Sequence, residues 1–452
     1  MNKNLYKLLS KCFVLVLSLF YSGTGFAQKP WTLEQCVKYA IENNITLKQQ
    51  KLNVNYNDNL LLQSKIDLAP SLNARFGHNF ISGKSTGEDN TTIIRDVQKT
   101  TFDAGIDVTL FNGLSKLNTI KLRKIELESS IQDLEKAKDD IALAVVSAYL
   151  EILFNKELVN ISKDQLEVTN QQIEHNAQLV KAGELAKGKL LETQAQKADE
   201  ELTLTNYENE LSLSLLNLMQ LLDLNISDSF DIVLPDFDPV LLSTKLSSSN
   251  EVYNAAVFDR PEIKSKELMV QKAMYDTKIA KAQRYPYLTA SVSYGNYYNN
   301  TFRYDNGVGP LIPLSEQLDL NGQKIAGLTL SIPIFNGYNV ETNIKNSRIG
   351  YENSNYDLQL AKNNLRKEIE QVHQNAVAAM KRYYSSERAV KSTEEAFRYV
   401  EEKFNLGIVT PLEYTESKNK VTNAQSSFIQ AKYEYIFRVK ILDFYMGKDI
   451  TL

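Results

Sequence analysis

Ala-Pro-Ser-Leu-Asn-Ala at residues 69–74 recurs as Tyr-Pro-Tyr-Leu-Thr-Ala at residues 285–290, an offset of 216 residues. Farther along the chain, Leu-Phe-Asn-Gly at 110–113 recurs as Ile-Phe-Asn-Gly at 334–337, an offset of 224 residues. The difference between the two offsets falls in a polar stretch that can lengthen freely. The repetition indicates that one large structural unit occurs twice in tandem.

The second offset also relates two pairs of single residues. It carries Gly183 onto Gly407 and Glu192 onto Glu416. A solenoid usually needs three or more repeats. The sequence therefore predicts two pseudo-symmetric halves of one assembly.

The first residues are expected to form a cleaved secretory signal. A basic segment with Lys3, Lys7 and Lys11 precedes a short apolar run, and Gly-Phe-Ala at 25–27 has the small-x-small pattern of a cleavage site. The apolar run is too short to span a membrane, which takes about 20 residues. Cys12 precedes this run instead of following it, so it is interpreted as a signal residue and not as a lipid anchor. The predicted organisation is a signal peptide at 1–27, a first repeat at 28–222, a linker or equatorial region at 223–249 and a second repeat at 250–452.

Charge and cysteine content exclude several classes of function. Loss of the three signal lysines changes the net charge from −4 to −7, which argues against nucleic acid as a partner. Cys36 is the only cysteine after the signal, so no intramolecular disulfide can form. His78, His175 and His373 are far apart in sequence, and the Glu370–His373 spacing has no second copy that would complete a carboxylate-bridged metal site. We predict no metal, no cofactor and no catalytic residue.

Four segments alternate apolar and polar residues, as strands with one buried face do. They cover about 72–80, 102–110, 288–294 and 328–334. Polar loops at 82–100 and 299–323 are expected to connect them in pairs. The sequence thus predicts two hairpins, each with a long loop.

Long helical patterns follow each Phe-Asn-Gly motif. Residues 115–180 contain neither Pro nor Gly, and apolar residues recur there at coiled-coil spacings. A similar pattern runs from 340 to 406. About 65 residues at 1.5 Å each extend over roughly 100 Å. Gly183 and Gly407 are expected to be turns, from which second helices return over about 187–222 and 411–446.

Four amphipathic strands cannot close a transmembrane barrel, because such barrels have at least eight strands and open edges are not tolerated in lipid. Each chain is therefore expected to contribute its four strands to a shared barrel. Two chains would give eight strands and a filled interior, and three would give twelve with a lumen.

The sequence resembles the TolC family of outer-membrane efflux and secretion channels over nearly the whole mature chain. The first-half motifs are Trp-Thr-Leu-Glu-Gln-Cys-Val at 31–37, with Ala40, Asn43 and Asn44, and Pro-Ser-Leu at 70–72. The second-half motifs are Arg-Pro-Glu-Ile at 260–263, Pro286, Ile-Pro-Ile-Phe-Asn-Gly at 332–337 and Phe-Asn-Leu-Gly at 404–407. Each motif is weak alone, and their order and duplication make the resemblance specific.

The resemblance implies an α+β membrane protein that forms a homotrimer in a bacterial outer membrane. Its barrel would have twelve strands, four from each chain, and would continue into a long coiled-coil barrel of helices in the periplasm. The long loops would face the exterior. A periplasmic adaptor protein would dock at the helical turns at Gly183 and Gly407 and connect the channel to an inner-membrane transporter.

The resemblance also suggests residues that line the narrow end of the tube. Glu413 and Glu416 are three residues apart and so share a helical face. In three chains they would form two carboxylate rings, which favour cations. Glu192 and Lys189 occupy the corresponding first-half positions, and Phe404 is adjacent to the gate. In other members of the family a network of side chains closes the tube, and a basic residue can occur at the position of Val409. Because Val409 cannot take part in such a network, a Lys189–Glu413 contact could replace it.

Two other classes of protein agree less well with the sequence. A periplasmic adaptor also has long helical hairpins, but it would need a lipoyl-like β-domain and usually an inner-membrane anchor. An enzyme would need a catalytic constellation, and the sequence contains no phosphate loop and no Gly-x-Ser-x-Gly motif. The sequence therefore favours a passive channel.

Overall fold

The computed structural model describes residues 30–86, 92–225, 230–235, 246–305 and 309–448. The predicted signal peptide at 1–27 lies outside these residues, as do parts of the predicted linker at 223–249. The chain folds into two compact units, each drawing on both predicted repeats. The first contains the chain up to Lys48 with Lys138–Ala256 and Lys367–Leu452, and the second contains Gln49–Ala137 and Val257–Arg366.

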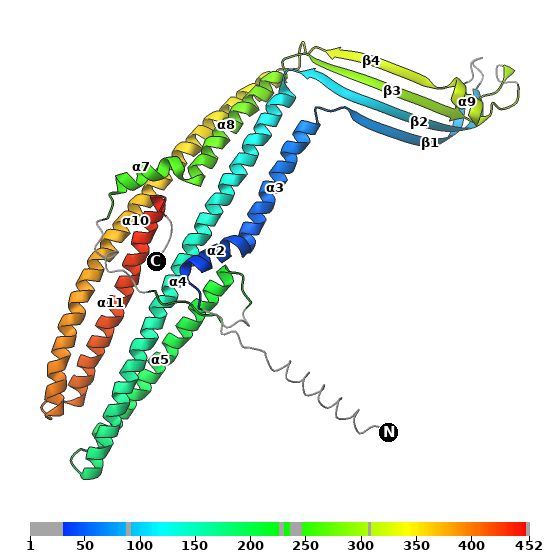
Figure 1. Ribbon diagram of the computed structural model, residues 1–452. Helices are drawn as coiled ribbons and strands as arrows, with labels where there is room; N and C mark the ends of the chain where they lie inside the picture. The colour runs from blue at the N-terminus through cyan, green and yellow to red at the C-terminus, as the bar shows by residue number, and fades with distance from the viewer. Residues whose placement is uncertain (1–29, 87–91, 226–229, 236–245, 306–308, 449–452) are drawn as a thin grey trace, which may run out of the picture. The chain divides into compact units, whose positions relative to one another are not determined.

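One antiparallel sheet forms the strand part of the second unit (Figure 1). Its strands, in spatial and chain order, are β1 (Ser71–Thr86), β2 (Thr92–Asn112), β3 (Tyr287–Asn299) and β4 (Gln323–Ser331). The two predicted hairpins are joined through β2 and β3, with Ile106 opposite Val292. Among the described residues, the outer edges of β1 and β4 have no partner strand.

The two faces of the sheet differ in polarity. Leu72, Ile106, Val292 and Ala326 form one row across the four strands on the apolar face. The neighbouring row on the other face consists of Ser71, Asp107, Ser291 and Gly327. Large side chains of the apolar face are exposed in the single chain, with Leu72 73% and Leu328 70% accessible. This face therefore needs a cover that the described residues do not supply.

The first hairpin is longer than the sequence indicated. The segment 82–100, predicted as a loop, continues both strands, and Thr86 pairs with Thr92. Its β-branched residues, among them Ile93, Ile94 and Val97, favour extended backbone and outweigh the polar neighbours. In the second hairpin β4 ends at Ser331, short of the predicted end at 334, because Pro333 has no N–H to donate to the ladder.

Four helices complete the second unit, some of them only in part. They are α3 (Ile45–Ile66), the start of α4 (Ser115–Ala182), α8 (Pro261–Ala282) and the start of α10 (Asn339–Asn405). Ser265 Oγ donates to Asp133 at 2.7 Å and lies 3.1 Å from Ser129 Oγ, so one partly buried and one buried polar contact tie α8 to α4. α4 and α10 confirm the two predicted long helices.

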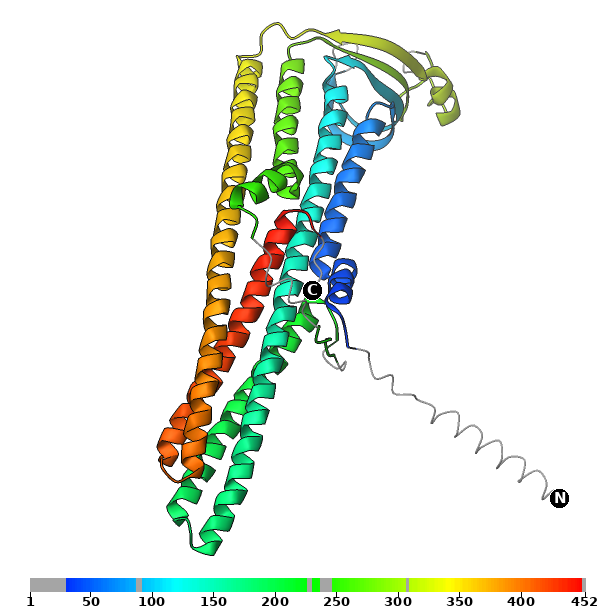
Figure 2. The same ribbon diagram turned by 60° about the vertical axis from the view of Figure 1, so that its left-hand side comes forward.

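Paired helices build the first unit. α4 packs against α5 (Lys187–Leu221), and α10 against α11 (Pro411–Tyr445), as Figures 1 and 2 both show. A buried core joins α4 and α5 to α2 (Leu33–Asn43); it includes Cys36, Tyr149, Ile152 and Leu218. A further helix, α7, covers Ser249–Asp259. None of the described helices combines the length and apolar character that a membrane crossing requires.

Thr-Leu-Glu-Gln at 32–35 has the sequence pattern of a capping box, and the sequence after it predicts one helix to about residue 66, but the structure interrupts this helix at Asn44. Thr32 forms the predicted capping box with Gln35 at the start of α2. The Asn44 side chain then accepts from Thr46 N at 2.9 Å, which caps a new helix. Asn44 Nδ2 also donates to the carbonyl of Leu221 at 3.0 Å, so the interruption fixes the end of α5.

Substitutions at Leu328 and Thr329 test which face of the sheet contacts lipid, because these neighbouring residues lie on opposite faces. The resemblance to outer-membrane channels implies that the apolar face contacts lipid. Leu328→Arg should then lower the amount of assembled protein in outer-membrane fractions, since a cation near the bilayer midplane costs about 2–4 kcal/mol. Thr329→Arg should assemble like the unmodified protein. Equal assembly of both variants would mean that the faces are assigned wrongly.

Candidate functional site

The two predicted turns have the same backbone geometry. Gly183 and Gly407 have φ angles of +78° and +73°, the left-handed conformation that favours glycine. In the first turn Glu184 N donates to Leu179 O at 2.9 Å, and Gly183 N to Val180 O at 3.1 Å. The second turn repeats the pattern with Ile408 N to Lys403 O at 2.9 Å and Gly407 N to Phe404 O at 2.9 Å. Both are Schellman motifs, so each glycine ends a long helix.

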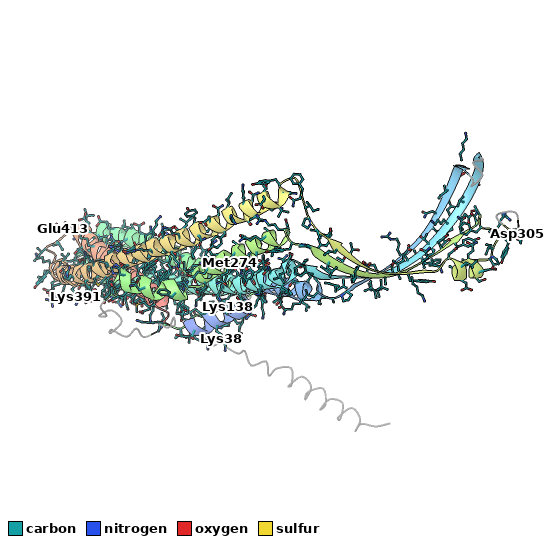
Figure 3. All side chains as sticks on the ribbon, turned by 90° about the horizontal axis from the view of Figure 1, so that it is seen from above. Lys38, Lys138, Met274, Asp305, Lys391 and Glu413 are labelled. Atoms are coloured by element: carbon teal, nitrogen blue, oxygen red, sulfur yellow. The ribbon has the colours of Figure 1, made fainter. Side chains whose placement is uncertain are left out.

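Glu413 lies at the turn end of its helical pair (Figure 3) and closes a capping box at the start of α11. Its carboxylate accepts from Thr410 N at 2.8 Å, and Thr410 Oγ1 accepts from Glu413 N at 3.2 Å. The hydrogen bonds from Thr410 hold the pKa of Glu413 below its usual value. The exposed carboxylate is therefore charged at neutral pH while it also orders the helix start.

The corresponding turn of the first half has no such cap. Ala186 is the N-cap of α5 and has no side chain that could accept a hydrogen bond. Lys189 occupies the position of Glu413, and a cation near a helix N-terminus is unfavourable because the helix dipole is positive there. The start of α5 is thus held less firmly than the start of α11.

The predicted aperture residues lie near both turns. Glu192, Glu413 and Glu416 are exposed, and Lys189 is half-buried. Within the described residues, no ion pair joins Lys189 to Glu413, whose carboxylate is engaged by Thr410. Whether the carboxylates surround a lumen depends on other copies of the chain, so their pore-lining role stays a prediction.

Phe404 packs inside its own helical pair. Its ring lies 4.5 Å from that of Tyr414, which also contacts Phe397 at 5.3 Å. Tyr414 is 4% exposed, and burial raises the pKa of its hydroxyl to about 12. Phe404 therefore joins α10 to α11 through an aromatic cluster.

A groove of about 570 Å³ runs between α5 and α11 beside this cluster. Its lining combines acidic, amide and apolar side chains, including Glu192, Asp199, Glu200, Phe404 and Leu412. Two of the predicted site residues, Glu192 and Phe404, thus come together at one surface, although they belong to different halves of the sequence.

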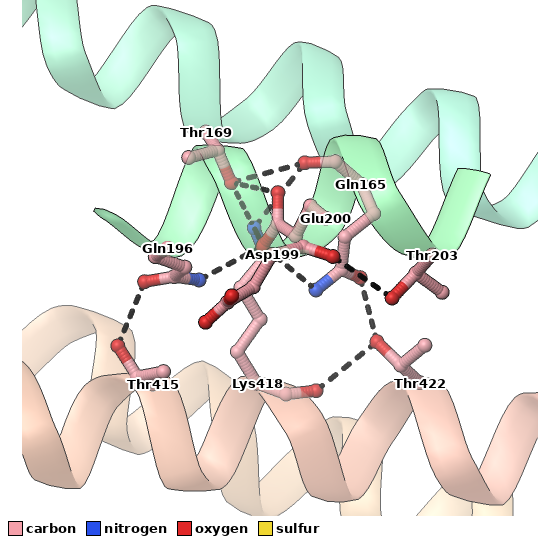
Figure 4. Close-up of polar contacts among 9 residues, drawn as sticks. All are labelled: Gln165, Thr169, Gln196, Asp199, Glu200, Thr203, Thr415, Lys418 and Thr422. Atoms are coloured by element: carbon pink, nitrogen blue, oxygen red, sulfur yellow. Dashed lines mark hydrogen bonds and ion pairs between the residues drawn. The ribbon is translucent and has the colours of Figure 1, made fainter. Parts of the chain in front are cut away.

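A buried lysine connects α11 to α4 and α5 (Figure 4). The Lys418 side chain is 5% exposed, and its ammonium lies 3.2 Å from the carboxylate of Glu200, which is 11% exposed. Lys418 Nζ also donates to Thr169 Oγ1 at 2.6 Å and to the Gln165 carbonyl at 3.2 Å. All three donor positions of the ammonium therefore have partners.

Amide and hydroxyl groups extend this cluster on both sides. Thr415 Oγ1 donates to Gln196 Oε1 at 2.8 Å, and Gln196 Nε2 donates to Glu200 at 2.9 Å. Thr422 Oγ1 donates to Gln165 Oε1 at 2.6 Å. Burial lowers the pKa of Lys418 in spite of the attraction of Glu200. The cluster fixes the second helical pair to the first in one register.

Sequence reasoning missed this cluster, although a signal was present. Tyr414, Lys418 and Val421 are spaced by four and three residues, the spacing of one helical face. A lysine between an aromatic and a β-branched residue on a packed face indicates a buried charge with a partner. The partner, Glu200, could not be identified without the fold.

The histidines do not converge. Within the described parts of the chain, no group of three His, Cys, Asp or Glu residues could hold a metal ion. Glu370 Oε1 accepts a hydrogen bond from Ser249 Oγ at 2.9 Å.

Comparison with known proteins gives a family match over most of the chain. The family model described as Outer membrane efflux protein matches residues 36–223 and 252–448. Toxin and drug export protein A of Aggregatibacter actinomycetemcomitans is 21% identical over 89% of this chain and 83% of its own. Outer membrane protein TolC of Vibrio cholerae is 23% identical over 66% of each chain.

Solved structures share the fold. The crystal structure of CusC, described in connection with transmembrane channel formation, has a TM-score of 0.76 and 14% identity, with 92% of each chain covered. Likeness at this identity reports on the fold alone.

The Lys418–Glu200 pair predicts a clear order of stabilities. Glu200→Gln should lower the free energy of unfolding by about 3–5 kcal/mol, because it leaves a buried ammonium without its counter-charge. Replacing both partners, with Lys418→Met and Glu200→Leu in one chain, should restore most of that loss. Thermal unfolding followed by the helical circular dichroism signal measures the order.

Glu201→Gln is the matched control, because the neighbouring Glu201 forms only a surface pair with Lys197 at 3.6 Å. Its loss should cost at most about 1 kcal/mol. Equal destabilisation by Glu200→Gln and Glu201→Gln would contradict the assignment of a buried pair.

Proposed function

The chain belongs to the outer membrane efflux protein family, and we propose that three copies of it form one conduit whose helical turns dock a periplasmic adaptor. It is a channel of the bacterial outer membrane that serves tripartite efflux or secretion systems, and it is not an enzyme.

The observation that carries the trimer is the open sheet. Within the described residues its two outer edges have no partner strand, and such edges are incompatible with lipid in a single chain, because unpaired backbone groups in a bilayer cost several kcal/mol each. Three sheets joined edge to edge would make twelve strands, with the polar face lining a lumen. The fold agrees with that of known channels of the family.

The acidic residues at the turns support a cation-selective aperture. Glu413 and Glu416 are exposed on one face of α11, and Glu192 is exposed on α5 at the corresponding position. Three chains would bring these carboxylates around one axis. Such rings attract cations and repel anions.

The second turn also presents apolar side chains that the described part of the chain leaves exposed. Leu406, Ile408 and Leu412 are 75%, 68% and 67% exposed around Gly407. Clustered apolar residues at the surface commonly mark a protein contact. We assign this patch to the adaptor, which would connect the channel to an inner-membrane transporter. Export, as named for the Aggregatibacter relative, fits this arrangement.

The aperture is tested by Glu413→Gln combined with Glu416→Gln. Glutamine also completes a capping box, so the start of α11 should remain ordered. In planar bilayers with a salt gradient, the reversal potential of the double variant should move toward zero, because the charges that favour cations are gone. Glu434→Gln, on the same helix and paired with Arg382 at 2.7 Å, is the control and should leave the reversal potential unchanged. An unchanged potential in the double variant would show that these glutamates do not line the pore.

Docking is tested with a photo-crosslinking amino acid placed at Ile408 in cells that express the complete efflux system. We expect a covalent adduct with a periplasmic protein that mass spectrometry identifies as an adaptor. The control is Tyr356 of α10, which is 67% exposed but belongs to the other unit. Absence of an adduct at Ile408, or the same adduct from both positions, would refute docking at the turn.

A further inference from the structure

A short helix lies over the outer end of β3 and was not predicted from the sequence (Figure 1). This helix, α9 (Leu314–Leu320), falls in the segment 299–323 that the sequence indicated as a loop. Each strand end at Ser71, Asn112, Tyr287 and Ser331 leads to a helix, so the opposite end of the sheet, where α9 lies, faces the exterior.

Buried hydrogen bonds hold α9 against the strand. Gln317 is 1% exposed, and its amide accepts from Asn299 N at 2.8 Å and donates to the Asn299 and Ile312 carbonyls at 3.0 and 2.8 Å. Asn321 Nδ2 donates to Tyr297 O at 2.9 Å. The helix therefore has one fixed orientation on the sheet.

The position of Asn296 shows which face α9 covers. Asn296 lies opposite Phe102 and shares the apolar face with Val292 and Tyr294. A bare amide at a lipid-facing position would be costly. Here Asn296 is 6% exposed and donates to Leu318 O of α9 at 2.7 Å and to Tyr294 Oη at 2.9 Å. α9 thus packs on the lipid-facing side of the sheet and not over the lumen.

The surrounding residues are typical of a membrane–water boundary. Tyr294 is opposite Lys324 on this face, and aromatic residues and lysines gather at the interfaces of membrane proteins. Between Leu288 and Tyr294 the strand rises roughly 20 Å at about 3.4 Å per residue. That length is close to the apolar band of about 25 Å in transmembrane sheets. α9 consequently lies where the apolar band ends.

α9 carries apolar and polar residues on different sides of the helix. Leu314 and Leu320 are 51% and 66% exposed on either side of the buried Gln317. Ser315 and Asp319 lie on the opposite side of the helix, two residues from Gln317 in each direction. The leucines lie on the two flanks of α9 next to the sheet-facing Gln317, and the polar residues lie on the side opposite Gln317.

We propose that α9 is an interfacial anchor that inserts Leu314 and Leu320 into the outer leaflet of the outer membrane. The two leucines contact lipid at the boundary between head groups and acyl chains. Amphipathic helices bind there through their buried apolar area. In addition, α9 shields the polar Asn296 from the acyl chains. The second hairpin is in this way fixed at a set depth in the bilayer.

The test introduces one additional cysteine at a time into the full chain, which is placed in phosphatidylcholine bilayers that contain a nitroxide-labelled lipid. Leu314→Cys and Leu320→Cys probe the leucine side, and Ser315→Cys and Asp319→Cys are the matched controls on the polar side. Each receives an environment-sensitive fluorophore. The buried Cys36 stays in place, and the unmodified chain reports any labelling there.

We expect labels at Leu314 and Leu320 to show blue-shifted emission and a loss of intensity to the nitroxide lipid. Labels at Ser315 and Asp319 should lose intensity to soluble iodide instead. Two leucine positions keep the test valid if one variant fails to assemble. Equal quenching by lipid at all four positions would overturn the proposal. So would leucine labels protected from both quenchers, a result that would indicate a neighbouring copy of the chain as the cover.

Discussion

The open sheet is the constraint on which the rest of the structure depends. Four strands leave two edges whose backbone groups need partners, and the apolar face needs lipid. Only other copies of the chain can supply partners for both edges within a membrane. The duplicated sequence builds this sheet from two similar parts. Each half contributes one hairpin to the sheet and one pair of long helices.

The two halves share a scaffold but differ where each meets its surroundings. Both long helices end in the same Schellman geometry, yet only the second turn is followed by a capped helix, through Thr410 and Glu413. Similarly, the first hairpin extends its strands and the second folds α9 back onto β3. The two halves thus have the same backbone framework. They differ in the side chains at the turns and in the segments that connect the strands.

Sequence patterns predicted the features that follow from local rules: the strand alternation, the uninterrupted α4 and α10, and the turns at Gly183 and Gly407. The same patterns did not predict the features that depend on tertiary contacts. Asn44 interrupts a helix by a side-chain cap that also contacts Leu221, α9 depends on the buried amides of Asn296 and Gln317, and Lys418 needs Glu200 from the other half of the chain. The helical spacing of Tyr414, Lys418 and Val421 indicates a packed lysine, but it does not identify the residue that pairs with it.

The copy number of the assembled protein tests the central claim most directly. Native mass spectrometry of the channel released from outer membranes in a mild detergent would measure it without any substitution. The account predicts a mass of three mature chains, since three sheets give twelve strands around a lumen. A single chain would contradict it, because the free edges of β1 and β4 would then face lipid, and a stable pair of chains would contradict the open conduit.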